Sequence, residues 1–267
     1  MSFSEFMTIG QYIPTQSFLH KLDPRTKLMF VFTYIVVIFF IHDYLGYTLL
    51  FLYTIVGMMI SRIPISYYWK GLIPILWMIL FTVILHLTMT KGGLVYFHYG
   101  WITIYENGVN LAFLVSFRLL LLVFMATMLT LTTSPMDLTM GLEKLMNPLN
   151  YVKVPVHELA LMMSISLRFI PTLLDETDKI MKAQKARGAN FETGPVHRRL
   201  LNMASIIIPL FVSAFKRADE LATAMEARGY RGKMGRTRLR TISYTWRDSC
   251  FAVVFVFFLL LLWWLKK

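Results

Sequence analysis

The sequence has little of what a soluble enzyme or a metal protein needs. It contains one cysteine, Cys250, in 267 residues, which excludes an intramolecular disulfide and a metal cluster held by several cysteines. His157-Glu158 begins a zinc-protease pattern, but Leu161 stands where that pattern needs a second histidine. The histidines are scattered and show no spacing typical of metal ligands, at positions 20, 42, 86, 98, 157 and 197. The sequence therefore predicts no catalytic residue and no metal site.

Motifs for nucleotides and for acyl chemistry are also missing. No Gly-x-x-x-x-Gly-Lys-(Ser/Thr) occurs, and the stretch from Gly229 to Lys233 has the wrong spacing for one. No Gly-x-Ser-x-Gly elbow occurs either. We therefore expect no cofactor in this chain, and if it takes part in ATP-driven work, ATP and Mg²⁺ must be bound by another chain.

Apolar residues dominate what is present. They make up 57% of the chain, and the mean hydropathy of +0.58 is well beyond that of a soluble domain. The net charge of +12 is then typical of cytoplasmic loops, and nucleic-acid binding is not expected. The N-terminus lacks the pattern of a cleaved signal peptide. These features predict a multi-pass protein of a bacterial inner (cell) membrane, in contact with the lipid bilayer.

Five apolar runs are candidates for membrane-spanning helices. They cover about Lys27 to Ile41, Tyr44 to Ile60, Gly71 to Met89, Val109 to Thr132 and Cys250 to Leu265. We expect an all-α integral membrane protein with three parts: an N-terminal transmembrane domain of four spans at 1–133, a cytoplasmic domain of long amphipathic helices at 134–247, and a C-terminal transmembrane helix at 248–267.

Charge orients the chain. The segment from Ser134 to Arg247 holds 18 Lys and Arg against 10 Asp and Glu, which places it, and the N-terminus, in the cytoplasm. Five spans would then place Lys266 and Lys267 outside, against the usual charge rule. A sixth span within residues 200–215 would return Lys266 and Lys267 to the cytoplasmic side, but it would split the basic segment. Both alternatives therefore stay open.

Two features of the spans stand out. The loop from Thr90 to Asn107 is rich in Tyr, Phe and Trp, which favours a position at the outer interface. Arg118 lies within the fourth span, where a charge costs roughly 2.5–3.5 kcal/mol at bilayer depth. We expect Arg118 to have a structural role, with an acid or backbone carbonyls as its partner.

The basic segment is predicted to contain three helices. Ser134 and Asp137 cap a short one that ends near Pro148. Two longer ones, each about 45 Å at 1.5 Å per residue, follow at His157–Arg187 and Val196–Arg228. Their apolar positions recur every three or four residues, so we expect them to lie along or beneath the membrane.

Four side chains on these two helices draw attention. Pro171 and Pro209 predict kinks. Arg168 is expected to pair within the same domain. The acidic residues around Glu176 are interspersed with lysines at three- and four-residue spacing, which predicts a solvated face.

The most informative feature is a repeat. The pattern Asp-x-(Ile/Leu)-x-x-Ala-x-x-Ala-Arg-Gly occurs from Asp178 to Gly188 and again from Asp219 to Gly229. Glycine just past a helix end and arginine in its last turn are both explained by capping and the helix dipole. Two matched copies point further, because a guanidinium is well suited to interfacial carboxylates. We therefore predict docking sites at Ala186-Arg187-Gly188 and Ala227-Arg228-Gly229.

Several segments in order resemble the EcfT/CbiQ family, the transmembrane coupling components of energy-coupling factor importers of vitamins and trace nutrients. The resemblance covers nearly the whole chain and includes, besides the two Ala-Arg-Gly ends, Leu19 to Lys27 and Leu167 to Pro171 with Glu176 following. It implies that Arg187 and Arg228 sit in grooves of two ATPase subunits. It also implies a separate small substrate-binding membrane subunit, of which several could exchange.

The sequence leaves some alternatives open. The contexts Gln184-Lys185 and Met225-Glu226 differ, which indicates two non-identical ATPase subunits. A cobalt or nickel importer of the same family is the nearest alternative function. A self-sufficient secondary transporter and a membrane enzyme are alternatives of another class, and the substrate itself is not predicted.

Overall fold

The computed structural model describes residues 12–99, 102–191, 195–230 and 243–265, and these are almost entirely helical. They form two compact units. The bundle unit comprises residues 12–99, 102–145 and 243–265, and the paired-helix unit comprises residues 146–191 and 195–230. Each unit is described below by itself.

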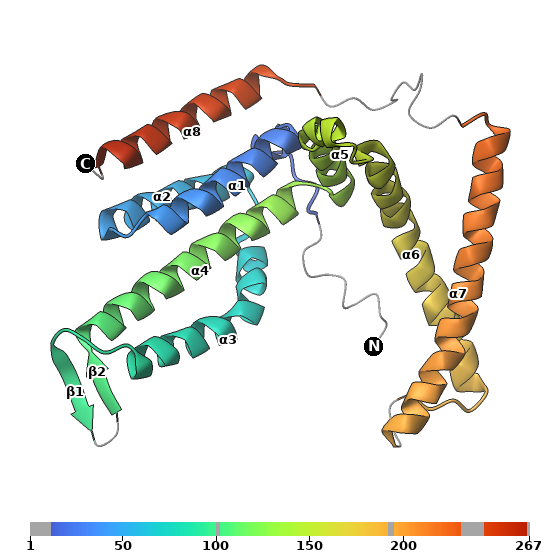
Figure 1. The fold of residues 1–267 in the computed structure, drawn as a ribbon, viewed down its shortest axis with the longest axis horizontal. Helices are drawn as coiled ribbons and strands as arrows, with labels where there is room; N and C mark the ends of the chain where they lie inside the picture. The colour runs from blue at the N-terminus through green and yellow to red at the C-terminus, as the bar shows by residue number, and fades with distance from the viewer. Residues whose placement is uncertain (1–11, 100–101, 192–194, 231–242, 266–267) are drawn as a thin grey trace. The chain divides into compact units, whose positions relative to one another are not determined.

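The bundle unit contains six helices and one β-hairpin among its described residues. Its elements are a 3₁₀ turn at Leu19–Lys21, α1 Pro24–Phe40, α2 Tyr44–Ser61, α3 Ile65–Met89, β1 Val95–Tyr99, β2 Ile102–Tyr105, α4 Glu106–Thr132, α5 Pro135–Leu145 and α8 Trp246–Leu265 (Figure 1). The paired-helix unit contains a 3₁₀ helix at Asn147–Val152, α6 Val156–Ala186 and α7 Val196–Ala227. All five apolar runs and all three helices of the basic segment are confirmed as helices.

The prediction for the segment between α3 and α4 was wrong in form. It is an antiparallel hairpin with Val95 opposite Tyr105 and Tyr99 opposite Ile102, and not an irregular loop. Alternating aromatic and β-branched residues favour a strand over a coil.

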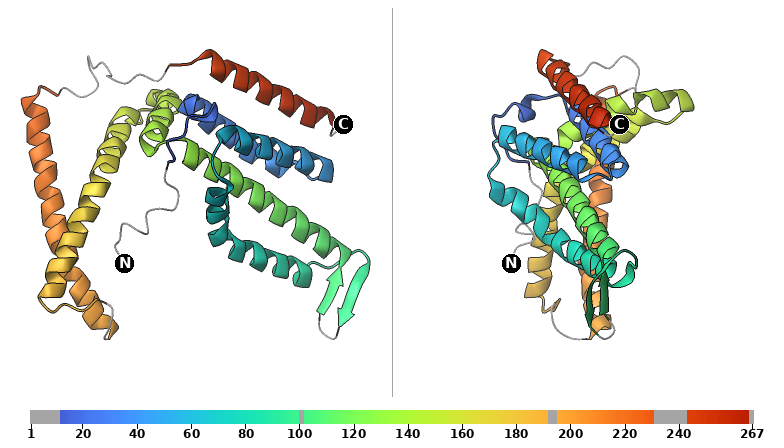
Figure 2. Two further views of the ribbon diagram at one scale, coloured as in Figure 1. Left: turned by 180° about the vertical axis from the view of Figure 1, so that it is seen from behind. Right: turned by 90° about the vertical axis from the view of Figure 1, so that its left-hand side faces the viewer.

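A bend in α3 was also missed. It is visible in Figures 1 and 2, and Pro74 lies inside the helix. Proline removes a backbone hydrogen bond and clashes with the preceding turn, which accounts for the bend.

Within the described ranges, six helices are long and apolar enough to cross a membrane, namely α2, α3, α4, α6, α8 and, from Arg199, α7. The set includes both long helices of the basic segment, and it omits α1, which has 17 residues. Length and composition alone therefore do not separate α6 and α7 from spans. Their position along or beneath the membrane stays a prediction.

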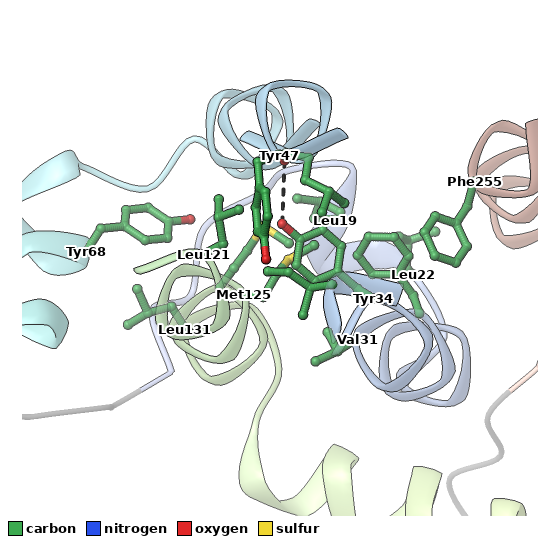
Figure 3. Packing of buried hydrophobic residues seen from close by; sticks show 14 of the residues in the cluster. Leu19, Leu22, Val31, Tyr34, Tyr47, Tyr68, Leu121, Met125, Leu131 and Phe255 are labelled. Carbon is green, nitrogen blue, oxygen red and sulfur yellow. Dashed lines mark hydrogen bonds between the residues drawn. The ribbon is translucent and has the colours of Figure 1, made fainter. Parts of the chain in front are cut away.

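The core of the bundle unit lies where α1, α2, α4 and α8 meet. Tyr34, Leu121 and Met125 are fully buried there (Figure 3). Two buried hydroxyls pair within this core: those of Tyr34 and Thr54 lie 2.8 Å apart. Many large apolar side chains on the outside of these helices are exposed, as expected of surfaces that face lipid.

Arg118 has its partner within the bundle unit. Its Nη2 and Nε donate to the hydroxyl of Tyr47 at 2.7 and 3.0 Å. Its guanidinium also lies 5.2 Å from the centroid of the Phe39 ring, close enough for a cation–π contact. The expectation of an internal partner is thus confirmed, but the partner is a tyrosine on α2 and not an acid or a backbone carbonyl.

The start of α1 is held by buried polar side chains from distant segments. Asp23 caps α1, since its carboxylate accepts from the N–H of Arg25 at 2.9 Å, and Pro24 takes the first helical position. Lys27 donates to the carbonyl of Thr132 at 2.9 Å and to the Thr133 hydroxyl at 3.1 Å. Lys27 therefore satisfies an orphan carbonyl at the C-terminal end of α4.

Asp248 joins the beginning of α8 to the beginning of α1. One carboxylate oxygen accepts from the N–H and the hydroxyl of Thr245 at 2.8 and 2.7 Å, which is one half of a capping box. The other oxygen accepts from the N–H of Asp23 at 2.7 Å. The Asp248 side chain is fully buried. This single carboxylate thus satisfies donors at two helix starts that are 225 residues apart in the chain.

The approach to α1 is ordered by His20. Its Nε2 donates to the carbonyl of Ile13 at 3.0 Å, and its Nδ1 lies 2.7 Å from the Ser17 hydroxyl. Burial lowers the pKa of His20 below its usual value. The ring therefore stays neutral at pH 7 and can both donate and accept in this turn.

We predict that Asp248→Ala lowers the stability of the bundle unit by about 3 kcal/mol, because the buried N–H of Asp23 and the two part-buried donors of Thr245 lose a charged acceptor. Asp248→Asn keeps one acceptor oxygen and should cost less. The melting temperature of the full chain in mild detergent is the measurement. Asp43→Ala is the control, since Asp43 is exposed and makes no side-chain cap. Equal melting temperatures for Asp248→Ala and Asp43→Ala would contradict the prediction.

Candidate functional site

The two Ala-Arg-Gly segments have nearly the same backbone geometry. Arg187 is the C-cap residue just after α6, at φ −83° and ψ 4°, and Arg228 is the C-cap residue just after α7, at φ −83° and ψ 6°. Gly188 follows at φ +90° and Gly229 at φ +71°. These are left-handed conformations that only glycine adopts at little cost. The predicted glycine caps are confirmed.

Each end closes with the same pair of backbone hydrogen bonds. At the first, the N–H of Gly188 donates to the carbonyl of Lys185 and the N–H of Ala189 to that of Gln184, both at 3.0 Å. At the second, the N–H of Gly229 donates to the carbonyl of Glu226 at 2.9 Å and the N–H of Tyr230 to that of Met225 at 3.0 Å. This is the Schellman arrangement, so the two helix ends have the same backbone closure.

Both tips are open to contact. Ala186, Arg187, Ala227 and Arg228 are all exposed. Among the residues that the structure describes, neither arginine has an ion pair or a side-chain hydrogen bond. A methyl group placed on either glycine would meet no atom within 4 Å. The glycines are therefore needed for their backbone angle, and no described residue lies within 4 Å of a methyl group placed on either one.

The helices that carry the tips are antiparallel. Gln184, near the end of α6, donates to the carbonyl of Ser205, early in α7, at 3.4 Å. Glu176, further back along α6, contacts Ser213 and Arg217, further along α7. Figures 1 and 2 show the two helices crossing, with their C-terminal ends at opposite ends of the pair. From Ser205 to Arg228 is about 35 Å at 1.5 Å per residue, so the two arginines are far enough apart for two separate partners.

Glu176 holds the crossing together. Its carboxylate accepts from Nη2 of Arg217 at 2.8 Å and from the Ser213 hydroxyl. Only 22% of its side chain is exposed. The expectation that Glu176 belongs to a solvated face with neighbouring lysines was wrong. Glu176 points toward α7, where it meets the guanidinium of Arg217. A guanidinium can bind a carboxylate through its planar fork, so it is a better partner than a lysine three or four residues away on α6.

The remaining residues singled out from the sequence lie away from the tips. Arg168 is exposed and forms no ion pair with any described residue. Pro171 and Pro209 lie within α6 and α7, and each helix continues through its proline. Figure 1 shows gradual curvature in α7. The short helix α5 is capped as predicted, because the Ser134 hydroxyl accepts from the N–H of Asp137 at 3.1 Å.

Two contacts were missed from the sequence, and their signals differ. Thr245 and Asp248 have the Thr-x-x-Asp spacing of a capping box directly before an apolar run, so the cap of α8 was readable. The pairing of Glu176 with Arg217 spans 41 residues. No local pattern reports it, because it depends on how two helices cross.

The described residues contain no group of three or more His, Cys, Asp and Glu side chains close enough to hold a metal ion. The chemistry available at the tips is recognition by two exposed guanidinium groups. A guanidinium binds planar carboxylates through two parallel hydrogen bonds. The arrangement is therefore that of two exposed guanidinium groups, one at the end of each of two paired helices.

We predict that Gly188→Ala and Gly229→Ala each destabilise the local helix end by about 1 kcal/mol, while Asn substitutions cost less. The reason is the positive φ alone, since the added methyl meets nothing. Hydrogen exchange at the amides of the residues after each arginine measures the fraying. Equal protection in the Ala and Asn variants would show that φ is not the constraint.

We predict that Glu176→Ala loosens the crossing by about 1–2 kcal/mol, since it removes a half-buried charged acceptor from Arg217 and Ser213. Glu220→Ala is the matched control. Glu220 pairs with Lys216 at 4.0 Å with both side chains largely exposed, and such pairs contribute little. Faster hydrogen exchange across the middle of α6 and α7 should appear in the first variant only, and its absence would contradict the prediction.

Comparison with known proteins finds one matching family model and several similar proteins. Residues 15–239 match the family model CbiQ, described as cobalt transport protein. The chain is 55% identical to the energy-coupling factor transporter transmembrane protein EcfT of Brevibacillus brevis, over 97% of this chain and 98% of that protein. It is 50% identical to the EcfT of Bacillus subtilis (97% and 98% covered) and 48% identical to that of Listeria innocua (98% and 99% covered).

Proposed function

The chain belongs to the CbiQ family, together with the EcfT transmembrane proteins of energy-coupling factor transporters, and we propose that it carries motion from two ATPase subunits to a substrate-binding membrane subunit. It is a multi-pass membrane protein and the transmembrane coupling component of such a transporter. The proposal concerns how it couples. One observation supports it above all: two matched and exposed arginine tips, without a partner in the described part of the chain, lie at opposite ends of one antiparallel helix pair.

In this proposal each tip enters a groove on one ATPase subunit. Arg187 and Arg228 pair there with carboxylates, and the small Ala186 and Ala227 allow close approach. Because both tips are closed by Schellman bonds, a push on an arginine moves the whole helix and not only its last turn. ATP and Mg²⁺ bind to the ATPase subunits, so this chain carries out no chemistry itself.

Differences between the tips support two non-identical ATPase subunits. Around the first tip, Lys185, Gly188, Ala189, Asn190 and Phe191 line a hollow of about 330 Å³. The loop after it is tied back to α7, where the amide of Asn202 donates to the carbonyl of Asn190 at 2.6 Å. A lysine precedes Ala186, whereas a glutamate precedes Ala227, so the two tips offer different charges to their grooves.

The substrate-binding membrane subunit would contact the apolar side of α7. Large apolar residues are exposed along the middle of that helix, among them Ile207, Ile208, Phe211, Val212 and Phe215. A patch of this kind is a feature of surfaces that meet another protein or a membrane. Methionines are frequent, 18 in the chain, and their soft side chains suit a surface that meets several exchangeable partners.

We propose that the protein lies in a bacterial cell membrane, with its paired-helix unit on the cytoplasmic side. The reason is the excess of basic residues in this part of the chain.

We predict that Arg187→Ala and Arg228→Ala each weaken assembly or uncouple ATP hydrolysis from uptake, because removing one member of a buried charge pair costs about 3–5 kcal/mol. The double variant should be more severe. Copurification of the ATPase subunits and substrate uptake into vesicles are the two measurements. Lys182→Ala and Lys216→Ala serve as controls, being exposed cations on the same two helices.

Normal assembly and transport by the double variant would contradict the mechanism. Uptake by the purified chain alone, with no ATPase copurifying, would instead indicate a secondary transporter. Uptake of cobalt or nickel, in a complex with partner subunits dedicated to that metal, would assign the chain to the metal-importing branch of the family.

A further inference from the structure

Two cavities of the bundle unit meet near the start of α1, the end of α2 and the start of α8. The first, here called the basic pocket, has a volume of about 590 Å³ and is lined by Lys21, Arg62 and Arg247 together with Gln16, Ser17 and Met59. The second, here called the apolar crevice, has a volume of about 170 Å³. Phe18 and Ile60 line both cavities, so the two are adjacent.

The basic pocket is built for an anion. No acidic side chain lines it. Lys21, Arg62 and Arg247 are all exposed, and none has an ion pair or a side-chain hydrogen bond with any residue in the described part of the chain. Three like charges on separate segments repel each other, so the free pocket is electrostatically unfavourable and a bound anion would relieve it.

Arg62 occupies its position at a conformational cost. It ends α2 with φ 56° and ψ 25°, in the left-handed region. Glycine or asparagine is the usual residue at such a helix end. An arginine at this position is unfavourable for the backbone, but it supplies a cation to the pocket. Unfavourable backbone conformations of this kind are concentrated at functional sites.

The apolar crevice is built for a hydrocarbon chain. Phe30, Tyr53, Val56, Met128, Phe251 and Val254 contribute to its walls. Gly57 keeps it open, because a methyl group at this position would lie 3.2 Å from the sulfur of Met128. A free phosphate ion would use the basic pocket alone, whereas a lipid would use both cavities at once.

The position of the two cavities matches the depth of a lipid. α2 has 18 residues, about 27 Å at 1.5 Å per residue, which is close to the hydrocarbon thickness of a bilayer. Arg62, just after its last residue, is thus at headgroup level, and the crevice extends from there toward the interior. Basic pockets between membrane helices are known binding sites for anionic headgroups.

We propose that the basic pocket and the apolar crevice together bind one anionic phospholipid. Its phosphate lies among Lys21, Arg62 and Arg247, and one acyl chain lies in the crevice between α1, α2 and α8. Since Arg62 belongs to the end of α2 and Arg247 to the start of α8, the bound lipid ties α8 to the rest of the bundle. The inference does not depend on the proposed transport mechanism.

The test uses the purified full chain in an uncharged detergent. Phosphatidylglycerol should raise the melting temperature by several degrees, and phosphatidylcholine with the same acyl chains should not. Native mass spectrometry should show one retained phosphatidylglycerol. A short-chain phosphatidylglycerol should give a smaller shift, since it cannot fill the crevice, and inorganic phosphate should give little or none.

Variants separate a specific site from general charge. The triple variant Lys21→Gln, Arg62→Gln, Arg247→Gln should lose the shift with phosphatidylglycerol. The control triple Lys91→Gln, Lys153→Gln, Lys182→Gln removes three exposed charges elsewhere and should keep it. Arg62→Gly should raise the melting temperature without lipid, because it relieves the left-handed backbone, yet weaken the response to lipid.

Three results would overturn the proposal. Equal shifts with phosphatidylglycerol and phosphatidylcholine would show that charge is not recognised. A full shift with inorganic phosphate would show an anion site with no role for the crevice. An unchanged shift in the triple variant would show that the lipid binds elsewhere.

Discussion

A buried carboxylate, that of Asp248, connects the two ends of the bundle. It accepts hydrogen bonds from the cap of α8 and from the N–H of Asp23 at the cap of α1. A helix start has N–H groups without partners in its own helix, and a buried one must find an acceptor elsewhere. One residue in the first turn of the last helix therefore also supplies an acceptor at the start of the first. Lys27, one turn further along α1, then reaches the end of α4, so the start of α1 serves as the joint of the bundle.

The paired-helix unit is organised by a different contact. Glu176 on α6 and Arg217 on α7 set the register of the crossing, and that register places the two Ala-Arg-Gly tips at opposite ends of the pair. Capping explains why each tip is rigid, and the crossing explains why there are two separate tips and not one cluster. In the proposed function, a displacement applied at either tip moves the helix that carries it, and the crossing passes that movement to the other helix.

Much of the fold was predictable from residues near each other in sequence. Apolar runs gave the helices, Ser134 and Asp137 gave the cap of α5, and the repeated Ala-Arg-Gly gave the two helix ends with glycine at positive φ. Pairings across the fold were not predictable. The partner of Arg118 is Tyr47, and that of Glu176 is Arg217. Each requires the packing of two helices, and an arginine in a sequence is equally compatible with an acid, a carbonyl or a phenol. The hairpin between α3 and α4 was hidden because a short aromatic segment fits an interfacial loop as well as a strand.

The sequence by itself determined the class of protein, the helices and the two arginine tips, because hydropathy, capping and glycine conformation act over a few residues. The tertiary structure decided which charges are used within the chain and which remain free. Glu176, Asp248 and Lys27 are taken up by contacts between helices, whereas Arg187 and Arg228 have no partner among the described residues. It also brought Lys21, Arg62 and Arg247 together around one cavity. Charge pairing depends on distances in space, and these distances exist only once the helices have packed.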